Sequence, residues 1–589
     1  MAYGNLGIAY RVLGEYQKAL EYYEKDLNIA KELGNKLGEG IAYNNLGNAY
    51  FSLHFNAKSD YNKDTSDTLL PIQKSERYCR ESLQCYESLF DNLGDQDQFK
   101  ISIVDTFIKT YQLLTAVYIE TGEIEQALLV SERKRARALE DILTAKYNLE
   151  KKSVLRHHEH FPKYADVERS VLSPDSCILF FSELVSPAGI DESGVGTWVL
   201  DLENPVSFCR NELQGVNTLL ENEFAVEEHQ KNKANIIDTL VDKAYTTMSV
   251  RGAVGRENRS LSIHEIAAVG NEAAEGVASS GRDTRGDMRC VYDEELNEDY
   301  LEVLYDTFIT PVKDKLNHDE IVIIPDGPLF KVPFAALRDP NTKSFLSETK
   351  RIRLVPSLTT LKILKESSAE SHSMTGALIV GDPDVTGKRM FKHKEMHFNP
   401  LPNAKLEAES IGKVLGVTAI TGAQATKQAI KQRLREGVAV IHFAAHGCAD
   451  SGDIVLSPGT TLQEAGKIPE EDDYLLTINE VQEIGLRARL VVLSCCHSGR
   501  GEIKSEGVVG MSRAFLAAGA LAVVASLWAV DDLATRVFME KFYGHLRQGK
   551  SASTSLQQAM KDMRDTKCYD KPMYWAPFFL IGDDVTINL

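Results

Sequence analysis

Apolar side chains recur at every third or fourth position through the N-terminal quarter of the chain, which is the spacing of amphipathic helices. Residues 2–10 (AYGNLGIAY) are echoed at 42–50 (AYNNLGNAY), an offset of 40 residues. A third copy follows near 116–128, at an offset of about 108. A fixed period of this size is typical of a helical solenoid, in which each unit buries its apolar face against the next. We therefore predict about three repeats over 1–152, the second interrupted by a polar insertion at 54–70.

The last helix of this array is predicted to run from residue 124 to about 151. It carries a basic cluster, Arg133, Lys134, Arg135 and Arg137. A run of like charges on a helix usually faces solvent, so the sequence favours an exposed basic face. A site for a phosphate or an acidic peptide is the alternative.

Beyond residue 153 the pattern changes to short apolar runs separated by Gly, Pro and Asp, which is typical of strands. The runs at 177–181 and 197–200 predict a hairpin, and the polar stretch 250–290 predicts a disordered loop. Further apolar runs lie at 321–324, 377–380, 438–443, 490–493 and 521–525. Helical segments lie between some of them, at 404–415, 426–435 and 507–518. Apolar strands that alternate with helices predict a mainly parallel sheet buried on both faces.

The predicted architecture is an all-α helical repeat solenoid followed by an α/β domain over 153–589. We divide that domain into an N-terminal subdomain, 153–310, and a catalytic subdomain, 311–589. In a parallel sheet the loops beyond the carboxyl ends of the strands build the site.

Charge and composition narrow the functional classes. The 589 residues include 66 basic and 85 acidic side chains, and the net charge of −19 repels phosphate backbones, so we expect no nucleic-acid partner. The most apolar stretch, 515–530, is shorter than the ~18–20 residues that a membrane span needs. The first residues lack the features of a signal peptide, and the nine cysteines include no C-x-x-C pair. We therefore expect a cytoplasmic location, free thiols and no metal or other cofactor.

Two strand ends carry candidate chemistry. His446 and Gly447 end the run that begins at 438, and Cys496 follows the run at 490–493, within LSCCHSG. Neighbouring parallel strands end at the same edge of a sheet, so the imidazole and the thiol are expected to converge there. A thiol becomes a good nucleophile when an imidazolium stabilises its thiolate. We predict that Cys496 is a nucleophile and His446 its base.

Three other interpretations of these residues remain open. Cys495 is the adjacent thiol, although neighbouring side chains of an extended segment point to opposite faces. A metal site is a second alternative, without a structural zinc spacing, and it would draw on His442, His446, Cys448, Cys495, Cys496 and His497. A redox-sensing pair of Cys495 and Cys496 is the third.

The same motifs resemble a known family. Five segments look like the CHAT domain, a caspase-like module found beside tetratricopeptide repeats. They are the segments around His446 and Cys496, ASLWAVDD at 525–532, IPDGPL at 324–329 and WAPF at 575–578. The resemblance covers roughly 155–589. With the 40-residue repeats, the chain most resembles the animal repeat-plus-CHAT proteins of the tetratricopeptide repeat protein twenty-eight group.

This resemblance implies a cysteine endopeptidase related to caspases and separase. Carried over by position, the dyad is His446 and Cys496, and the backbone N–H groups of Gly447 and Cys496 form the oxyanion hole. For animal members it also implies scaffold roles around cell division. The alternative function is therefore a non-catalytic scaffold or adaptor whose CHAT domain is a binding module.

Several residues are secondary candidates. His497 and Ser498 lie beside the nucleophile and are candidates for substrate contact. Asp531 and Asp532 are candidates to pair with a basic substrate side chain, and a helix N-cap is the alternative role.

The repeats suggest a further partner besides a protein substrate. We expect them to bind a protein or peptide in a concave groove near Asn5, Tyr10 and Asn45. A rigid junction between the repeats and the α/β domain would let that partner regulate or target the protease.

Overall fold

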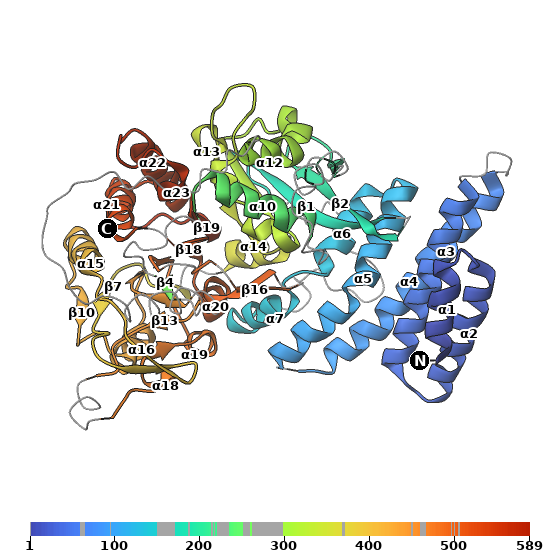
Figure 1. Cartoon of the computed structure of the whole chain (residues 1–589), viewed down its shortest axis with the longest axis horizontal. Helices are drawn as coiled ribbons and strands as arrows, with labels where there is room; N and C mark the ends of the chain where they lie inside the picture. Colours follow the sequence, from blue (N-terminus) through green and yellow to red (C-terminus); the bar gives the residue numbers. More distant parts are fainter. Residues whose placement is uncertain are drawn as a thin grey trace, which may run out of the picture.

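The computed structural model describes most of the chain. The described residues are 2–58, 65–94, 96–149, 171–186, 189–211, 213, 216, 218, 220, 235–250, 260–261, 299–367, 371–448, 452–459, 467–495, 498–499, 501–504, 507–529 and 531–588. The helical N-terminal part lies at one end of the long axis and the C-terminal helices lie at the other (Figure 1).

The N-terminal part consists of packed helical hairpins, which confirms the predicted repeats. The helices that pair are α1 (Ala2–Val12) with α2 (Tyr16–Glu32), α3 (Lys36–Lys58) with α4 (Thr65–Asp91), and α5 (Asp97–Thr121) with α6 (Ile124–Arg133). Gly7 lets the first two helices approach closely, because a Cβ at this position would lie 2.4 Å from the Tyr23 ring. The predicted loop at 54–70 is wrong in extent: both helices continue into it, and only 59–64 lie outside the described residues.

The α/β part is built on one sheet of eleven strands in the order β10-β7-β11-β15-β18-β19-β6-β5-β1-β2-β3. The strands, in chain order, are β1 (Ser176–Ser186), β2 (Gly189–Leu200), β3 (Ser207–Asn211), β5 (Glu320–Ile324), β6 (Arg351–Leu354), β7 (Ala377–Pro383), β10 (Ile420–Gly422), β11 (Val440–Ala444), β15 (Leu490–Leu493), β18 (Ala522–Ser526) and β19 (Phe578–Gly582). Most neighbouring pairs are parallel, and β1 and β2 form the predicted antiparallel hairpin. The fold class predicted from the sequence is therefore confirmed.

The sheet contains a reversal that the apolar pattern did not predict. Strand β19 runs antiparallel to β18 but parallel to β6, and β6 is parallel to β5. The run at 321–324 therefore points opposite to the four later runs, although all five look alike in sequence. The predicted mainly parallel sheet allows such a reversal, but apolar composition reports burial and carries no information about which strand runs the other way. The predicted helix at 507–518 also needs correction, since its first four residues form β17 (Gly507–Gly510) and α20 is Met511–Ala518.

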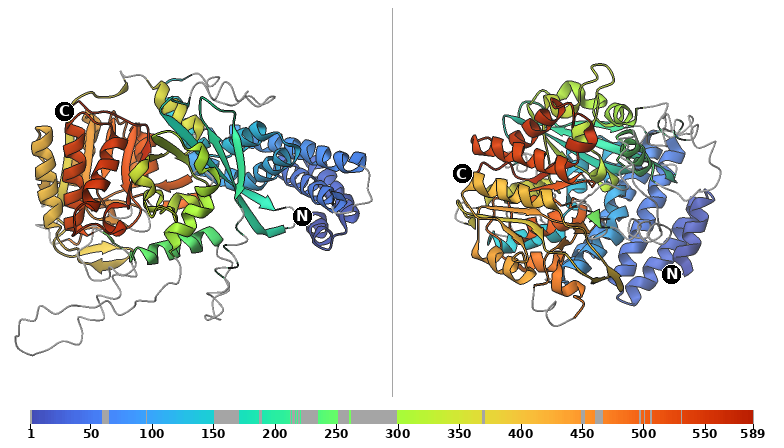
Figure 2. Two further views of the ribbon diagram at one scale, coloured as in Figure 1. Left: turned by 90° about the horizontal axis from the view of Figure 1, so that it is seen from above. Right: turned by 60° about the vertical axis from the view of Figure 1, so that its left-hand side comes forward.

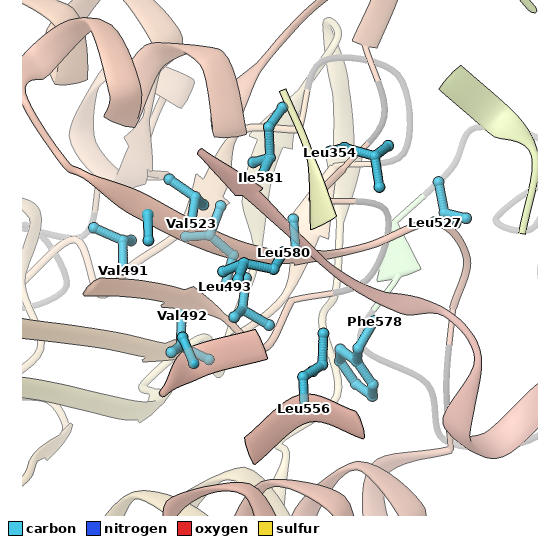
Figure 3. Packing of buried hydrophobic residues seen from close by; sticks show 14 of the residues in the cluster. Leu354, Val491, Val492, Leu493, Val523, Leu527, Leu556, Phe578, Leu580 and Ile581 are labelled. Carbon is cyan, nitrogen blue, oxygen red and sulfur yellow. The ribbon is translucent and has the colours of Figure 1, made fainter. Parts of the chain in front are cut away.

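Buried side chains continue across this reversal. Val491, Val523 and Ile581 belong to the same core cluster, on three successive strands (Figure 3). Phe578 of β19 and Leu556 of α22 (Ala552–Arg564) are also buried in it (Figure 3). The strands on the two sides of the antiparallel step therefore share one core.

The last repeat helices pack directly against the sheet. Side chains of α5 and α6 form one buried cluster with alternate residues of β1, such as Ile178 and Phe180. The intervening Cys177, Leu179 and Phe181 face the other cluster, as the period of two requires. The Trp198 indole N–H donates to the carbonyl of Ile124 at 3.2 Å. Repeats and sheet thus share a core, and Figure 2 shows the helices against the end of β1 and β2.

The junction that follows corrects two predictions. The array does not end in one helix over 124–151, because α6 stops at Arg133 and α7 (Arg137–Lys146) begins after a break in which Ala136 has φ 46°. The basic cluster is also not exposed, since Lys134, Arg135 and Arg137 are each 4% exposed or less.

Two carboxylates from other segments of the chain, Glu87 and Asp326, form ion pairs with this basic cluster. Lys134 Nζ lies 2.5 Å from Asp326 Oδ2, and Arg135 donates to the carbonyl of Pro325 at 2.6 Å and to that of Phe181. Arg137 Nη2 donates to Glu87 Oε2 at 2.6 Å. Burial would raise the pKa of Glu87, but Arg137 and Arg133 outweigh it and lower that pKa to about 2. The junction is therefore a buried network of charged hydrogen bonds between repeats and sheet.

Candidate active site

His446 lies just beyond the end of β11 and is 4% exposed. Its Nε2 is 2.7 Å from the carbonyl oxygen of Asn399. A carbonyl oxygen only accepts, so Nε2 must carry the hydrogen. The neutral ring then has its lone pair on Nδ1, which makes Nδ1 the nitrogen that can take a proton.

The backbone beside His446 is held by a small second sheet. Gly447 and Cys448 form β12, which pairs antiparallel with β13 (Ile454–Val455) and parallel with β4 (Ser260–Leu261). The N–H of Val455 also donates to the carbonyl of His446 at 3.0 Å. Val250 and strand β4 are the described parts of the segment predicted to be a loop at 250–290, and the rest of that stretch lies outside the described residues.

The neighbouring strand leads to the two adjacent cysteines. Phe443 of β11 pairs with Leu493 of β15 in parallel register. Cys495 is buried, and its thiol donates to the carbonyl of Phe443 at 3.6 Å. The Cys495 side chain therefore faces the interior. Cys496 and His497 lie outside the described residues.

The backbone on either side of position 496 is fastened to the end of β18. The Ser526 hydroxyl donates to the carbonyl of Cys495 at 2.8 Å, and the N–H of Gly499 donates to the carbonyl of Ser526 at 2.9 Å. Ser498 is completely buried, and its hydroxyl donates to the carbonyl of Leu493 at 3.0 Å. These contacts give Ser498 a role in the turn and do not support the predicted contact with substrate.

Asp531 and Asp532 also form contacts within the chain. Asp531 is the N-cap of α21 (Asp532–Arg547) and accepts from the N–H of Ala534 at 3.0 Å. Asp532 is 2% exposed and accepts from the N–H of Asn403 at 3.0 Å. Asp531 thus takes the N-cap alternative, and the burial of Asp532 does not support pairing with a substrate side chain.

Glu407, His442 and Tyr543 form a buried hydrogen-bonded group that the sequence does not predict. His442 Nε2 is 2.9 Å from Glu407 Oε1, and the Tyr543 hydroxyl is 3.2 Å from His442 Nδ1. Burial raises the pKa of Tyr543 well above its usual value, so the hydroxyl is protonated and can donate to Nδ1. These side chains fasten α15 (Pro402–Leu415) and α21 to strand β11. The sequence named His442 only as a candidate metal ligand, and within the described part of the chain no three metal-ligating side chains cluster.

The predicted partner-binding residues lie on the first helices of two repeats. Asn5 is exposed on α1, and Asn45 is half-buried on α3. The Tyr10 ring stacks on Tyr22 with centroids 5.3 Å apart, and Lys18 Nζ lies 5.4 Å from its centroid. Only part of the Tyr10 ring therefore remains for a ligand. Among the described helices, none is long and apolar enough to cross a membrane.

Comparisons with known proteins agree with the two-part architecture. Residues 298–583 match the CHAT domain, and residues 1–56 match the tetratricopeptide repeat. Tetratricopeptide repeat protein 28 is similar over 85% of this chain, with 26% identity for the Mus musculus protein and 24% for the Homo sapiens protein. The chain spans 23% of the length of each of these relatives.

Two solved structures are similar at low identity. Separase in the Saccharomyces cerevisiae separase–securin complex is 11% identical with a TM-score of 0.45, and the match covers 100% of this chain and 50% of that one. The Arg-specific cysteine proteinase gingipain R is 11% identical with a TM-score of 0.33, and the match covers 50% of this chain and 69% of that one.

Proposed function

Because the chain combines tetratricopeptide repeats with a CHAT domain, we propose that it is a cysteine endopeptidase of the caspase-like type with a His446–Cys496 dyad. The observation that carries this proposal is the hydrogen bond from His446 Nε2 to the carbonyl of Asn399, which leaves Nδ1 as the basic nitrogen at a strand end. Phe443 and Leu493 pair across the sheet, and His446 and Cys496 each follow that pair by three residues in sequence. Parallel neighbours are about 4.8 Å apart, so this register favours their convergence.

In the proposed reaction, His446 takes the proton of the Cys496 thiol. The thiolate attacks the peptide carbonyl carbon, and the N–H groups of Gly447 and Cys496 stabilise the resulting oxyanion. The C–N bond then breaks, and the His446 imidazolium gives its proton to the leaving amine. Water hydrolyses the thioester and restores the thiol.

Labelling with a cysteine-directed peptide electrophile at pH 7 tests the dyad. We expect selective modification of Cys496 that is lost in His446→Ala, because the thiol then lacks its base. Cys495→Ala is the matched control and should leave labelling of Cys496 largely intact, since the Cys495 thiol faces the interior. Slow, equal labelling of several cysteines in the intact protein would contradict the proposal.

One observation favours the alternative, a scaffold whose CHAT domain is a binding module. Strand β4 of the chain itself already pairs with β12, on which Gly447 lies. Since β4 occupies the edge of β12, a peptide substrate cannot pair with β12 at that edge, as expected if the domain only binds partners. The labelling experiment separates the two functions, because a scaffold has no need of a selectively reactive Cys496.

We further propose that a protein or peptide bound to the repeats, near Asn5 and Asn45, regulates or targets the protease. The contact that supports regulation joins α5 to the hairpin of β16 (Gly501–Lys504) and β17, which follows Cys496 closely in the chain. Lys504 Nζ lies 3.6 Å from Asp105 Oδ2 of α5. A shift of the repeats would therefore reach the segment that carries the nucleophile.

Reversing the charge in Lys504→Glu is expected to change the labelling rate of Cys496 by up to about fivefold, since a half-exposed ion pair contributes about 1 kcal/mol at most. Adding Asp105→Lys should restore the rate by restoring the pair. Arg433→Glu, which breaks an exposed pair with Glu436 on α16 (Lys427–Glu436), is the control. A Lys504→Glu rate equal to that of the control would show that the hairpin does not transmit the signal.

A further inference from the structure

The ring of His446 is oriented by a backbone carbonyl in a loop, so something else must hold that loop in place. Asn399 lies between β9 (Lys394–Met396) and α15 and is itself exposed. A carbonyl in an exposed loop orients an imidazole only if the loop has one fixed position. Phe398 before Asn399 and Leu401 after it are buried in apolar clusters, and the polar contacts that fix the loop are found at the start of α15, two to four residues further on.

Two carboxylates from other elements bind this helix start. Asp382, near the end of β7, accepts from the N–H of Leu401 at 2.7 Å. Asp532, the first residue of α21, accepts from the N–H of Asn403 at 3.0 Å. Pro402, which lies between them, has no N–H. The first backbone donors of α15 are therefore satisfied by side chains of β7 and α21, rather than by a cap of its own.

Asp382 makes its contact from the turn at the end of β7. Its φ is 44°, in the left-handed region that Asp tolerates better than most non-glycine residues. The preceding residue shows how closely the elements approach: a Cβ at Gly381 would lie 2.3 Å from the Cβ of Ala408 on α15.

The two carboxylates and the buried His442–Glu407 contact hold α15 in complementary ways. Glu407 fastens the middle of the helix to β11, the strand that ends before His446. Asp382 and Asp532 fasten its first turn, and therefore the loop that presents Asn399. The distance from His446 to the Asn399 carbonyl therefore depends both on the contact of α15 with β11 and on the contacts at its first turn.

We propose that Asp382 and Asp532 are positioning residues for His446: they hold the N-terminal turn of α15 so that the Asn399 carbonyl keeps the hydrogen of the imidazole on Nε2. Neither carboxylate contacts the reacting atoms, and both act through the backbone of 399–403. This inference rests on the proposed function for its catalytic consequence, but the tautomer of His446 can be measured without any activity.

The test uses the full chain with 13C-labelled histidine, and the His446 signal is assigned by its loss in His446→Ala. We expect Asp382→Ala and Asp532→Ala each to shift the His446 ring away from the Nε2–H tautomer. Each should also slow electrophile labelling of Cys496 by about 10- to 100-fold, as a displacement of about 1 Å does at a catalytic group. Asp382→Asn and Asp532→Asn retain an acceptor oxygen and should restore both signals.

Neighbouring carboxylates provide matched controls. Asp531→Ala removes the N-cap of α21, and Asp384→Ala removes a contact with Thr386 in its own loop. Both are expected to leave the His446 tautomer unchanged even where they lower stability. Tautomer signals in the Asp382 and Asp532 variants that match these controls would overturn the inference. The absence of selective labelling in the unmodified chain would instead refute the dyad and leave the tautomer result to decide the positioning role.

Discussion

Replacing Asp326 with alanine is expected to lower the free energy of unfolding by about 3–5 kcal/mol, which is the cost of leaving a buried charge without its partner. Lys134 and Arg135 both pair with this carboxylate, and each of these basic residues is 3% exposed or less. Their guanidinium and ammonium groups cannot reach water without separating the repeats from the sheet. The loss should therefore affect both parts of the chain in one transition.

Chemical denaturation followed by circular dichroism measures this effect. The matched control is Asp238→Ala, which breaks an exposed pair with Lys331 and should cost about 0–1 kcal/mol. If Asp326→Ala is no more destabilising than the control, or if the repeats and the sheet unfold separately in the unmodified protein, the junction does not join them energetically.

The same substitution has a defined dependence on pH. Burial would raise the pKa of Asp326, but Arg135 and Lys134 outweigh burial and lower that pKa to about 2. A carboxyl whose pKa is lower in the folded state stabilises the fold above its unfolded pKa of about 3.9, and this contribution is lost as pH falls toward 2. The difference in stability between the unmodified chain and Asp326→Ala should therefore be constant near neutral pH and shrink below about pH 4.

The largest effect on activity is expected from the dyad. Cys496→Ala should abolish peptide cleavage, because it removes the proposed nucleophile, and His446→Ala should lower kcat by about 10²–10⁴-fold. Cys495→Ala should retain most of the activity, since its thiol bonds to the carbonyl of Phe443 inside the protein. Turnover of a peptide library by the purified variants measures all three, and cleavage that survives in Cys496→Ala would exclude this nucleophile.

Much of the fold follows from local patterns in the sequence. The 40-residue offset between Tyr10 and Tyr50 predicts the repeats, and β-branched runs such as that ending at Ile324 predict the buried strands. The direction of that strand and the burial of Lys134 could not be predicted in the same way. Both depend on partners far along the chain. Strand β19 lies between β18 and β6 in the sheet and separates the strands that run in opposite directions, and Asp326 is 192 residues from Lys134. A basic run appears solvated until its distant carboxylates are known.

The candidate site, like the fold, is only partly predictable from the sequence. The strand-end position of His446 is readable from sequence, because an apolar run and a following glycine mark it. Its partner Asn399 is not, since every residue has a carbonyl and only the path of the loop selects one. The charge of Asp532 suggests a contact with substrate, but the contact it makes is with a backbone N–H on α15. Sequence can identify residues capable of chemistry, whereas the groups that orient them depend on tertiary packing.

Mapping of newly formed protein N-termini tests whether this chain cleaves proteins through Cys496, as we propose. A proteome is incubated with the intact chain or with Cys496→Ala, and all N-termini are then sequenced by mass spectrometry. We predict a set of new N-termini that share a sequence preference before the cut, that appear with the intact chain and Cys495→Ala, and that are absent with Cys496→Ala. Identical N-termini with the intact chain and with Cys496→Ala would contradict the claim and favour the scaffold.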